Sequence, residues 1–178
     1  MDKGNGPGGG GAGAEFVITR VFNARRDLVF RAWTEADQLA RWFGPKGCVI
    51  GVVKLDLRPG GTFHFSMRTQ DGTEMWGKWV FREIVVPERI VLVNSFSDAK
   101  GGLTRHPANP AWPLEMISTT TFAEEEGKTS LTVRWAPLNP NGKERSAFDG
   151  AHELMKIGWT GTLDQLEAHL VRQAGGGN

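Results

Sequence analysis

Histidine, cysteine and tyrosine, three residue types that often carry acid–base, nucleophilic or metal chemistry, are few or absent in this chain. There are four histidines, one cysteine, Cys48, and no tyrosine among 178 residues. No two histidines stand at the spacing of a zinc site, no histidine or basic cluster adjoins Cys48, and no phenol is available as an acid or base. We therefore predict no catalytic residue, no metal and no cofactor, and a stability that does not respond to chelator or reductant.

Polar side chains that strand and helix periodicity would point into a common interior are equally sparse. They are Ser118, Thr120 and Thr162. His64 falls on the outer face of its strand, and His169 lies near the end of a helix. His152 follows the apolar Ala151 and can approach the edge of an interior face. Because isolated histidines are usually solvated, we predict a surface role for each of the four.

Apolar side chains make a stronger case than polar ones, and they point to the binding of a hydrophobic molecule. The chain has seven tryptophans and ten phenylalanines, most of which a core of this size would absorb. Methionine adapts its shape to varied apolar partners and recurs at four inward positions, which are Met67, Met75, Met116 and Met155.

The elements that would position these residues follow from periodicity. A first strand is predicted at residues 16–22, followed by a turn in which Asn23 can cap a helix. Two short helices are expected at residues 25–34 and 35–42, and Gly44-Pro45 ends them. Residues 48–137 then alternate as six strands of a strongly bent antiparallel meander.

Alternation within these strands assigns an inward face. The inward residues are Phe63, Phe65 and Met67; Met75, Gly77, Trp79 and Phe81; Leu114, Met116, Ser118, Thr120 and Phe122; and Leu131, Val133 and Trp135. Residues 143–172 have one apolar face and are predicted to form a single long helix, which must bury that face against the concave sheet. Two layers that meet at a curved surface leave a gap wherever side chains do not reach. This predicts an α+β fold with a pocket between sheet and helix.

The chain ends differ from this unit in composition. Residues 1–14 and 173–178 are mostly glycine and are predicted to be disordered, which leaves one domain at residues 15–172. The hydrophobic fraction of 39% is that of a globular protein, and a net charge of +1 without a basic stripe argues against nucleic-acid binding. No apolar run is long enough to span a membrane and no secretion signal is visible, so a cytoplasmic protein without membrane insertion is expected.

The order strand, two short helices, six strands, long helix resembles the helix-grip superfamily, also called START-like or SRPBCC. That superfamily includes lipid-transfer domains, the birch-pollen-allergen fold and polyketide cyclases. Within it the chain is similar to the family of the C-terminal domain of the activator of the heat-shock-protein-90 ATPase. The matching segments are Trp42-Phe43-Gly44-Pro45, residues 56–61 (DLRPGG), residues 87–90 (PERI) and residues 158–166 (GWTGTLDQL).

The resemblance implies a helix-grip fold and a cavity for small hydrophobic molecules. On that basis we predict a ligand site and a lid in the irregular segment 97–113, with Trp112 as its latch. The predicted ligand-binding residues are Phe63, Phe65, Met67, Met75, Trp79, Met116, Ser118, Met155, Gly158, Trp159 and Thr162.

Three functions are compatible with this pattern. The first is a module that carries, senses or sequesters a small hydrophobic ligand. The second is an enzyme of the cyclase, dehydratase or hydrolase type acting on a bound apolar substrate, which the scarcity of inward polar groups disfavours. The third is a co-chaperone-like interaction domain, which is disfavoured because the co-chaperone drives the ATPase with a separate N-terminal domain that has no counterpart in this sequence. A chaperone partner is therefore not expected.

Overall fold

The computed structural model describes residues 13–176. Residues 1–12 and 177–178, which include most of the glycine-rich ends predicted to be disordered, lie outside the described residues. Gly13 and Ala14 are not part of a helix or strand, and the Ala14 carbonyl accepts a hydrogen bond from Arg145 Nη2 at 2.8 Å.

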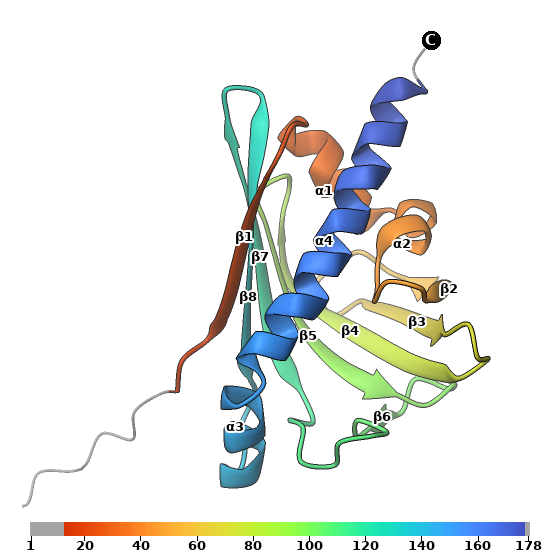
Figure 1. The fold of residues 1–178 in the computed structure, drawn as a ribbon, viewed down its shortest axis with the longest axis vertical. Coiled ribbons are helices and arrows are strands. Elements are labelled where there is room, and N and C mark those ends of the chain that lie inside the picture. The colour runs from red at the N-terminus through yellow and green to blue at the C-terminus, as the bar shows by residue number, and fades with distance from the viewer. Residues whose placement is uncertain (1–12, 177–178) are drawn as a thin grey trace, which may run out of the picture.

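The strands form one curved antiparallel sheet, with spatial order β1-β8-β7-β5-β4-β3-β2 (Figure 1). Their bounds are β1 Phe16–Phe22, β2 Val49–Leu55, β3 Thr62–Arg68, β4 Glu74–Val85, β5 Arg89–Ser97, β7 Met116–Glu125 and β8 Lys128–Pro137. The predicted six-strand meander is confirmed, with one addition. A two-residue strand, β6 (Leu103–Thr104), pairs with the end of β5 inside the segment predicted to be irregular.

Breaks in register bend the sheet. The β2–β3 pairing shifts between Val52 and Lys54, and the β4–β5 pairing shifts between Phe81 and Glu83. An extra residue in one strand increases its local bend and twist, so these irregularities help to curve the sheet around its concave face. The predicted inward rows lie on that face, which is where the hydrophobic core forms, except that Leu114 precedes β7 and belongs to no strand.

Two short helices follow β1 as predicted, α1 (Arg26–Thr34) and α2 (Ala36–Trp42). The predicted cap is wrong. Arg25, not Asn23, is the N-cap residue of α1, and it makes no side-chain cap bond. Instead the Arg26 backbone N–H donates to Glu124 Oε2 at 3.2 Å, so a residue of β7 satisfies a helix terminus that the local sequence leaves open.

The single helix predicted at residues 143–172 is two helices in the structure, and the second of them is the long C-terminal helix. The structure has α3 (Gly142–Asp149) and then α4 (His152–Gly175), separated at Gly150 and Ala151. Asn141 and Glu144 form a reciprocal capping box at the start of α3. At the other end α4 continues to Gly175, three residues past the predicted boundary of the domain.

Helix α4 crosses the concave face of the sheet, with α1 and α2 beside its C-terminal half and α3 at its N-terminal end (Figure 1). Its buried residues are Met155, Trp159, Thr162, Leu163, Leu166, His169 and Leu170. This confirms the predicted apolar face and the α+β class. No helix within residues 13–176 is long and apolar enough to cross a membrane.

Candidate functional site

A cavity of about 580 Å³ lies between the concave face of the sheet and the N-terminal half of α4. Ten of the eleven predicted ligand-binding residues line it, together with Trp112. The exception is Phe63, which is fully buried and packs beside the cavity, its ring stacked 4.6 Å from that of Phe65. The structure thus brings the predicted residues together, and their contact with a ligand remains a prediction.

The lining also contains fifteen residues outside the predicted ligand-binding set, of which Gly77 and Trp135 were predicted to face inward. They are Trp33, Phe43, Gly44, Pro45, Gly77, Leu92, Asn94, Ser95, Phe96, His106, Asn109, Pro113, Trp135, Ala151 and Leu154. Those from strand β5 were missed because residues 90–93 (IVLV) are apolar on both faces of the strand, so alternation alone does not choose the inward side. The segment 43–45 was assigned only to the end of a helix.

One side of the cavity is held in place by contacts between two of the family-like sequence segments. Thr162 Oγ1 donates to the Gly44 carbonyl at 3.1 Å, and Gln165 Nε2 donates to the same oxygen at 2.7 Å. Gly44 has φ +97°, a backbone conformation that L side chains rarely adopt. The turn after α2 and the middle of α4 therefore depend on one another, and the Thr162 hydroxyl proton is shared between two carbonyl acceptors, those of Gly44 and Gly158, each at 3.1 Å.

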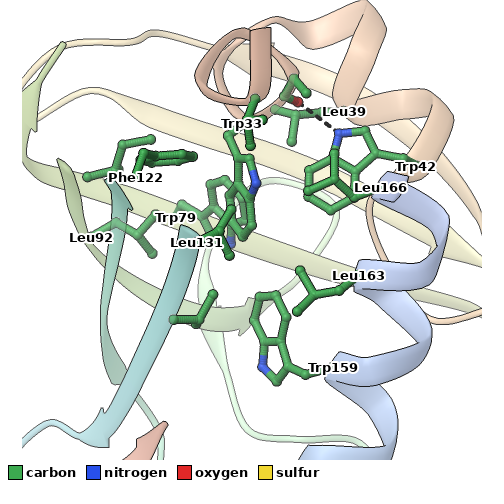
Figure 2. Packing of buried hydrophobic residues seen from close by; sticks show 14 of the residues in the cluster. Trp33, Leu39, Trp42, Trp79, Leu92, Phe122, Leu131, Trp159, Leu163 and Leu166 are labelled. Carbon is green, nitrogen blue, oxygen red and sulfur yellow. Dashed lines mark hydrogen bonds between the residues drawn. The ribbon is translucent and has the colours of Figure 1, made fainter. Parts of the chain in front are cut away.

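Aromatic rings form the deep wall. Trp33 of α1 lies between Trp79 of β4 and Trp159 of α4, with ring centroids 6.5 Å and 6.1 Å away and nearly parallel planes (Figure 2). Five of the seven tryptophans line the cavity. Gly77 makes room for a further ring, because a Cβ at that position would come within 2.5 Å of the Phe65 ring.

The segment predicted to be a lid contributes His106, Asn109, Trp112 and Pro113 to the cavity lining. Trp112 is half-buried and its ring centroid lies 6.1 Å from that of Phe148 in α3. Arg105 Nη1 and Glu144 Oε1 are 2.8 Å apart, which ties the segment to α3, and this ion pair lowers the pKa of Glu144. That the segment opens and closes remains a prediction.

His106, in the same segment, is the one ionisable residue among those that line the cavity within the described chain. Its Nδ1 accepts hydrogen bonds from the backbone N–H groups of Ala108 and Asn109, at 3.0 Å and 3.1 Å. In the neutral ring the proton therefore lies on Nε2, which makes this nitrogen a donor. Burial lowers the pKa of His106, which favours the neutral ring.

Two polar atoms of lining residues lack a hydrogen-bond partner among residues 13–176. They are Asn94 Oδ1 and Trp33 Nε1, and both are buried. Two of the other inward polar groups make hydrogen bonds: Trp135 Nε1 donates to Ser118 Oγ at 3.0 Å, and Thr162 Oγ1 donates to a carbonyl. The cavity therefore offers one buried unpaired acceptor and one buried unpaired donor, beside the His106 Nε2 donor and the Ser118 hydroxyl proton, within a mostly apolar lining.

The predicted surface roles of His64 and His169 are wrong. His64 is on the outer side of β3, but the loop after β5 covers it, and its Nε2 donates to the Asp98 carbonyl at 3.2 Å. His169 is 2% exposed and donates from Nε2 to Gln38 Oε1 of α2 at 3.1 Å. His152 is partly buried against the rings of Phe16 and Phe148 and does not belong to the cavity lining.

Chemically, the site can enclose an apolar molecule of moderate size. Within the described residues no group of three histidine, cysteine, aspartate or glutamate side chains is placed to hold a metal ion. Cys48 is partly buried and is not among the residues that line the cavity.

Comparison with protein families finds one match. The family described as Activator of Hsp90 ATPase homolog 1-like protein matches residues 23–171. A search of curated proteins found no match.

Solved structures of bacterial proteins share the fold. A protein from Arthrobacter aurescens, solved by NMR, is 23% identical with a TM-score of 0.75, and the match covers 89% of this chain and 86% of that one. A protein from Mycobacterium smegmatis is 24% identical with a TM-score of 0.71, covering 89% and 92%. A Silicibacter pomeroyi protein described as AHSA1 is 19% identical with a TM-score of 0.67, covering 90% and 99%. At these identities the likeness shows the helix-grip fold alone.

Proposed function

The chain belongs to the family of Activator of Hsp90 ATPase homolog 1-like proteins, and on that premise we propose that it binds a small hydrophobic molecule between its sheet and α4. The observation that carries the proposal is the cavity of about 580 Å³ with its aromatic and methionine lining. Pockets for drug-sized ligands span roughly 300–1,000 Å³ and are mostly apolar with a few placed polar groups. A carrier, sensor or sequestering protein fits this description.

The polar groups of the cavity favour binding over catalysis. General acid–base chemistry needs a group that can take up and release a proton near neutral pH. His106 is a poor base because its Nδ1 lone pair is occupied by two backbone N–H groups and its Nε2 carries the proton. No carboxylate, lysine or arginine of the described chain lines the cavity to assist it.

The test is a titration with the neutral apolar dye N-phenyl-1-naphthylamine. Binding is expected to be saturable and to quench tryptophan fluorescence, because five tryptophans line the cavity. Two variants fill the space. Gly158→Trp adds a ring at a lining position where a Cβ meets open space, and Met155→Trp enlarges a buried lining residue. Each should weaken dye binding at least tenfold.

The matched control is Gly161→Trp. Gly161 lies on the same helix and also faces open space, but it does not line the cavity. This variant should bind the dye like the wild type, and melting temperatures should show that all three variants are folded. The proposal fails if the wild type shows no saturable binding, or if folded Gly158→Trp and Met155→Trp proteins bind as tightly as the control.

A further inference from the structure

We infer that the cavity selects an uncharged ligand with an apolar skeleton and one hydrogen-bonding group, such as a hydroxyl, which Asn94 and Trp33 bind. The inference rests on the proposed function and goes beyond it by specifying the polarity and charge of the ligand.

The first support is the pair of unpaired polar atoms. Asn94 Oδ1 and Trp33 Nε1 are buried without a hydrogen-bond partner among the described residues, although both residues line the cavity. A buried polar atom without a partner is costly, and nearly all such atoms in folded proteins have one. A ligand that supplies the missing partner would recover this cost on binding, whereas a pure hydrocarbon would leave it in place.

The second support is the placement of the two residues around a third. Asn94 stands opposite Trp79 on β4 and opposite Met116 on β7, so it occupies the middle of the concave face. The Trp33 ring stacks on the Trp79 ring at 6.5 Å. The unpaired acceptor and the unpaired donor thus belong to two residues that both neighbour Trp79, one through strand register and one through ring stacking. A hydroxyl can donate to Asn94 Oδ1 or accept from Trp33 Nε1, and a rotated Asn94 amide would still pair with it.

The third support is the absence of charge. Among the described residues that line the cavity there is no lysine, arginine, aspartate or glutamate, and His106 in its neutral form has its acceptor nitrogen occupied. An ion that entered this space would lose its hydration without gaining a counter-charge. A neutral polar group loses far less and gains an unused partner.

The experiment compares three ligands with one skeleton at pH 7: naphthalene, 2-naphthol and 2-naphthoate, which differ by hydrogen, a neutral hydroxyl and a carboxylate. Calorimetric titration of the full chain should give 2-naphthol roughly tenfold tighter than naphthalene, as expected for one neutral hydrogen bond. The carboxylate should be the weakest ligand. Naphthoate binding as tight as that of naphthol would overturn the assignment of a neutral ligand.

Substitutions of Asn94 and Trp33 test whether these two residues cause the preference for naphthol over naphthalene. Asn94→Leu should abolish the preference for naphthol while retaining naphthalene binding, and Trp33→Phe should reduce the preference. The control is Ser97→Ala: Ser97 Oγ is also buried without a partner among the described residues, but Ser97 does not line the cavity, so this variant should leave the preference unchanged. The inference fails if the wild type does not prefer naphthol, or if the preference survives in Asn94→Leu. If the wild type binds none of the three ligands and no dye, the proposed function fails as well.

Discussion

The two halves of the interface between α4 and the sheet are built from the same pair of elements, yet one is solid and the other is hollow. In the C-terminal half, Leu166 is fully buried on the side of α4 that faces α2, whose Leu39 and Trp42 are at most 1% exposed (Figure 2). In the N-terminal half, Met155, Gly158 and Trp159 face a cavity of about 580 Å³.

The difference comes from a third element. Helices α1 and α2 pack beside the C-terminal half of α4, and Trp42 Nε1 donates to the Ala32 carbonyl at 2.8 Å, which fixes that large ring in the gap. Among residues 13–176 no helix packs beside the other half in this way, and the lining there contains the small residues Gly77, Ala151 and Gly158. A concave sheet and a helix therefore make a solid core only where another element fills the space between them.

The largest expected effect on stability comes from shortening one buried side chain in each half to alanine. Leu166→Ala should lose about 3–5 kcal/mol of unfolding free energy, because it opens a new cavity in close-packed surroundings. Met155→Ala should lose no more than about 2 kcal/mol, since it only enlarges space that already exists. Urea unfolding measures both. Equal losses would mean that the two halves are packed alike and that the distinction is wrong.

A second prediction uses the unpaired polar group of the hollow half. Asn94→Leu should raise the unfolding free energy by about 1–2 kcal/mol, because it replaces a partly buried amide, whose Oδ1 is buried without a partner, with an apolar side chain of similar size. Denaturant unfolding of the ligand-free protein measures the gain. A loss of stability would show that Asn94 has a structural partner, and it would remove one support for the ligand that we infer.

A third prediction concerns acid. Burial, followed by the nearby cations Arg172 and Arg41, lowers the pKa of His169 in the solid half, and burial lowers the pKa of His106 beside the cavity. The unfolded state therefore binds more protons than the folded state as the pH falls below the ordinary histidine value of about 6.5. Stability should be fully present above that pH and should decline on acidification through the folded-state pKa values.

The two histidines separate the contributions of the two halves. His169→Gln should flatten the dependence of stability on pH below about 6.5, as should His106→Gln, and thermal melts across the pH range measure the slopes. An unchanged slope in both variants would contradict a pKa that is lowered by folding at these positions.

The smallest expected effect tests the exposed side of α4. Gly161→Ala should stabilise the protein by about 0.5–1 kcal/mol, because alanine favours a helix and a Cβ at this position meets nothing within 4 Å. Gly158→Ala should do the same, and both should leave dye binding intact because a methyl group occupies little of the cavity. Thermal unfolding would contradict the prediction if either alanine destabilised the helix.

Much of this organisation could be predicted from the sequence. Alternation placed Phe65, Met75, Trp79 and Met116 on the concave face, and helical spacing aimed Met155 at them, because strand and helix periodicities are local properties of the chain. The family-like segments also indicated the correct fold, and two of them contact each other in the structure. Thr162 and Gln165 in one of them bond the Gly44 carbonyl in another.

Other features were decided by the tertiary structure. The break at Gly150 and Ala151 is invisible in the apolar spacing, which runs on from Phe148 to Met155. His169 is buried because α2 brings Gln38 to within 3.1 Å of it, although the two residues are far apart in sequence. Strand β5 gave no signal that Asn94 faces inward. Periodicity determines which residues share a face of a strand or helix. Whether that face is buried, whether its polar atoms find hydrogen-bond partners and whether a cavity remains beside Trp159 depend on the distant segment that packs against it. Only the folded chain brings those segments together.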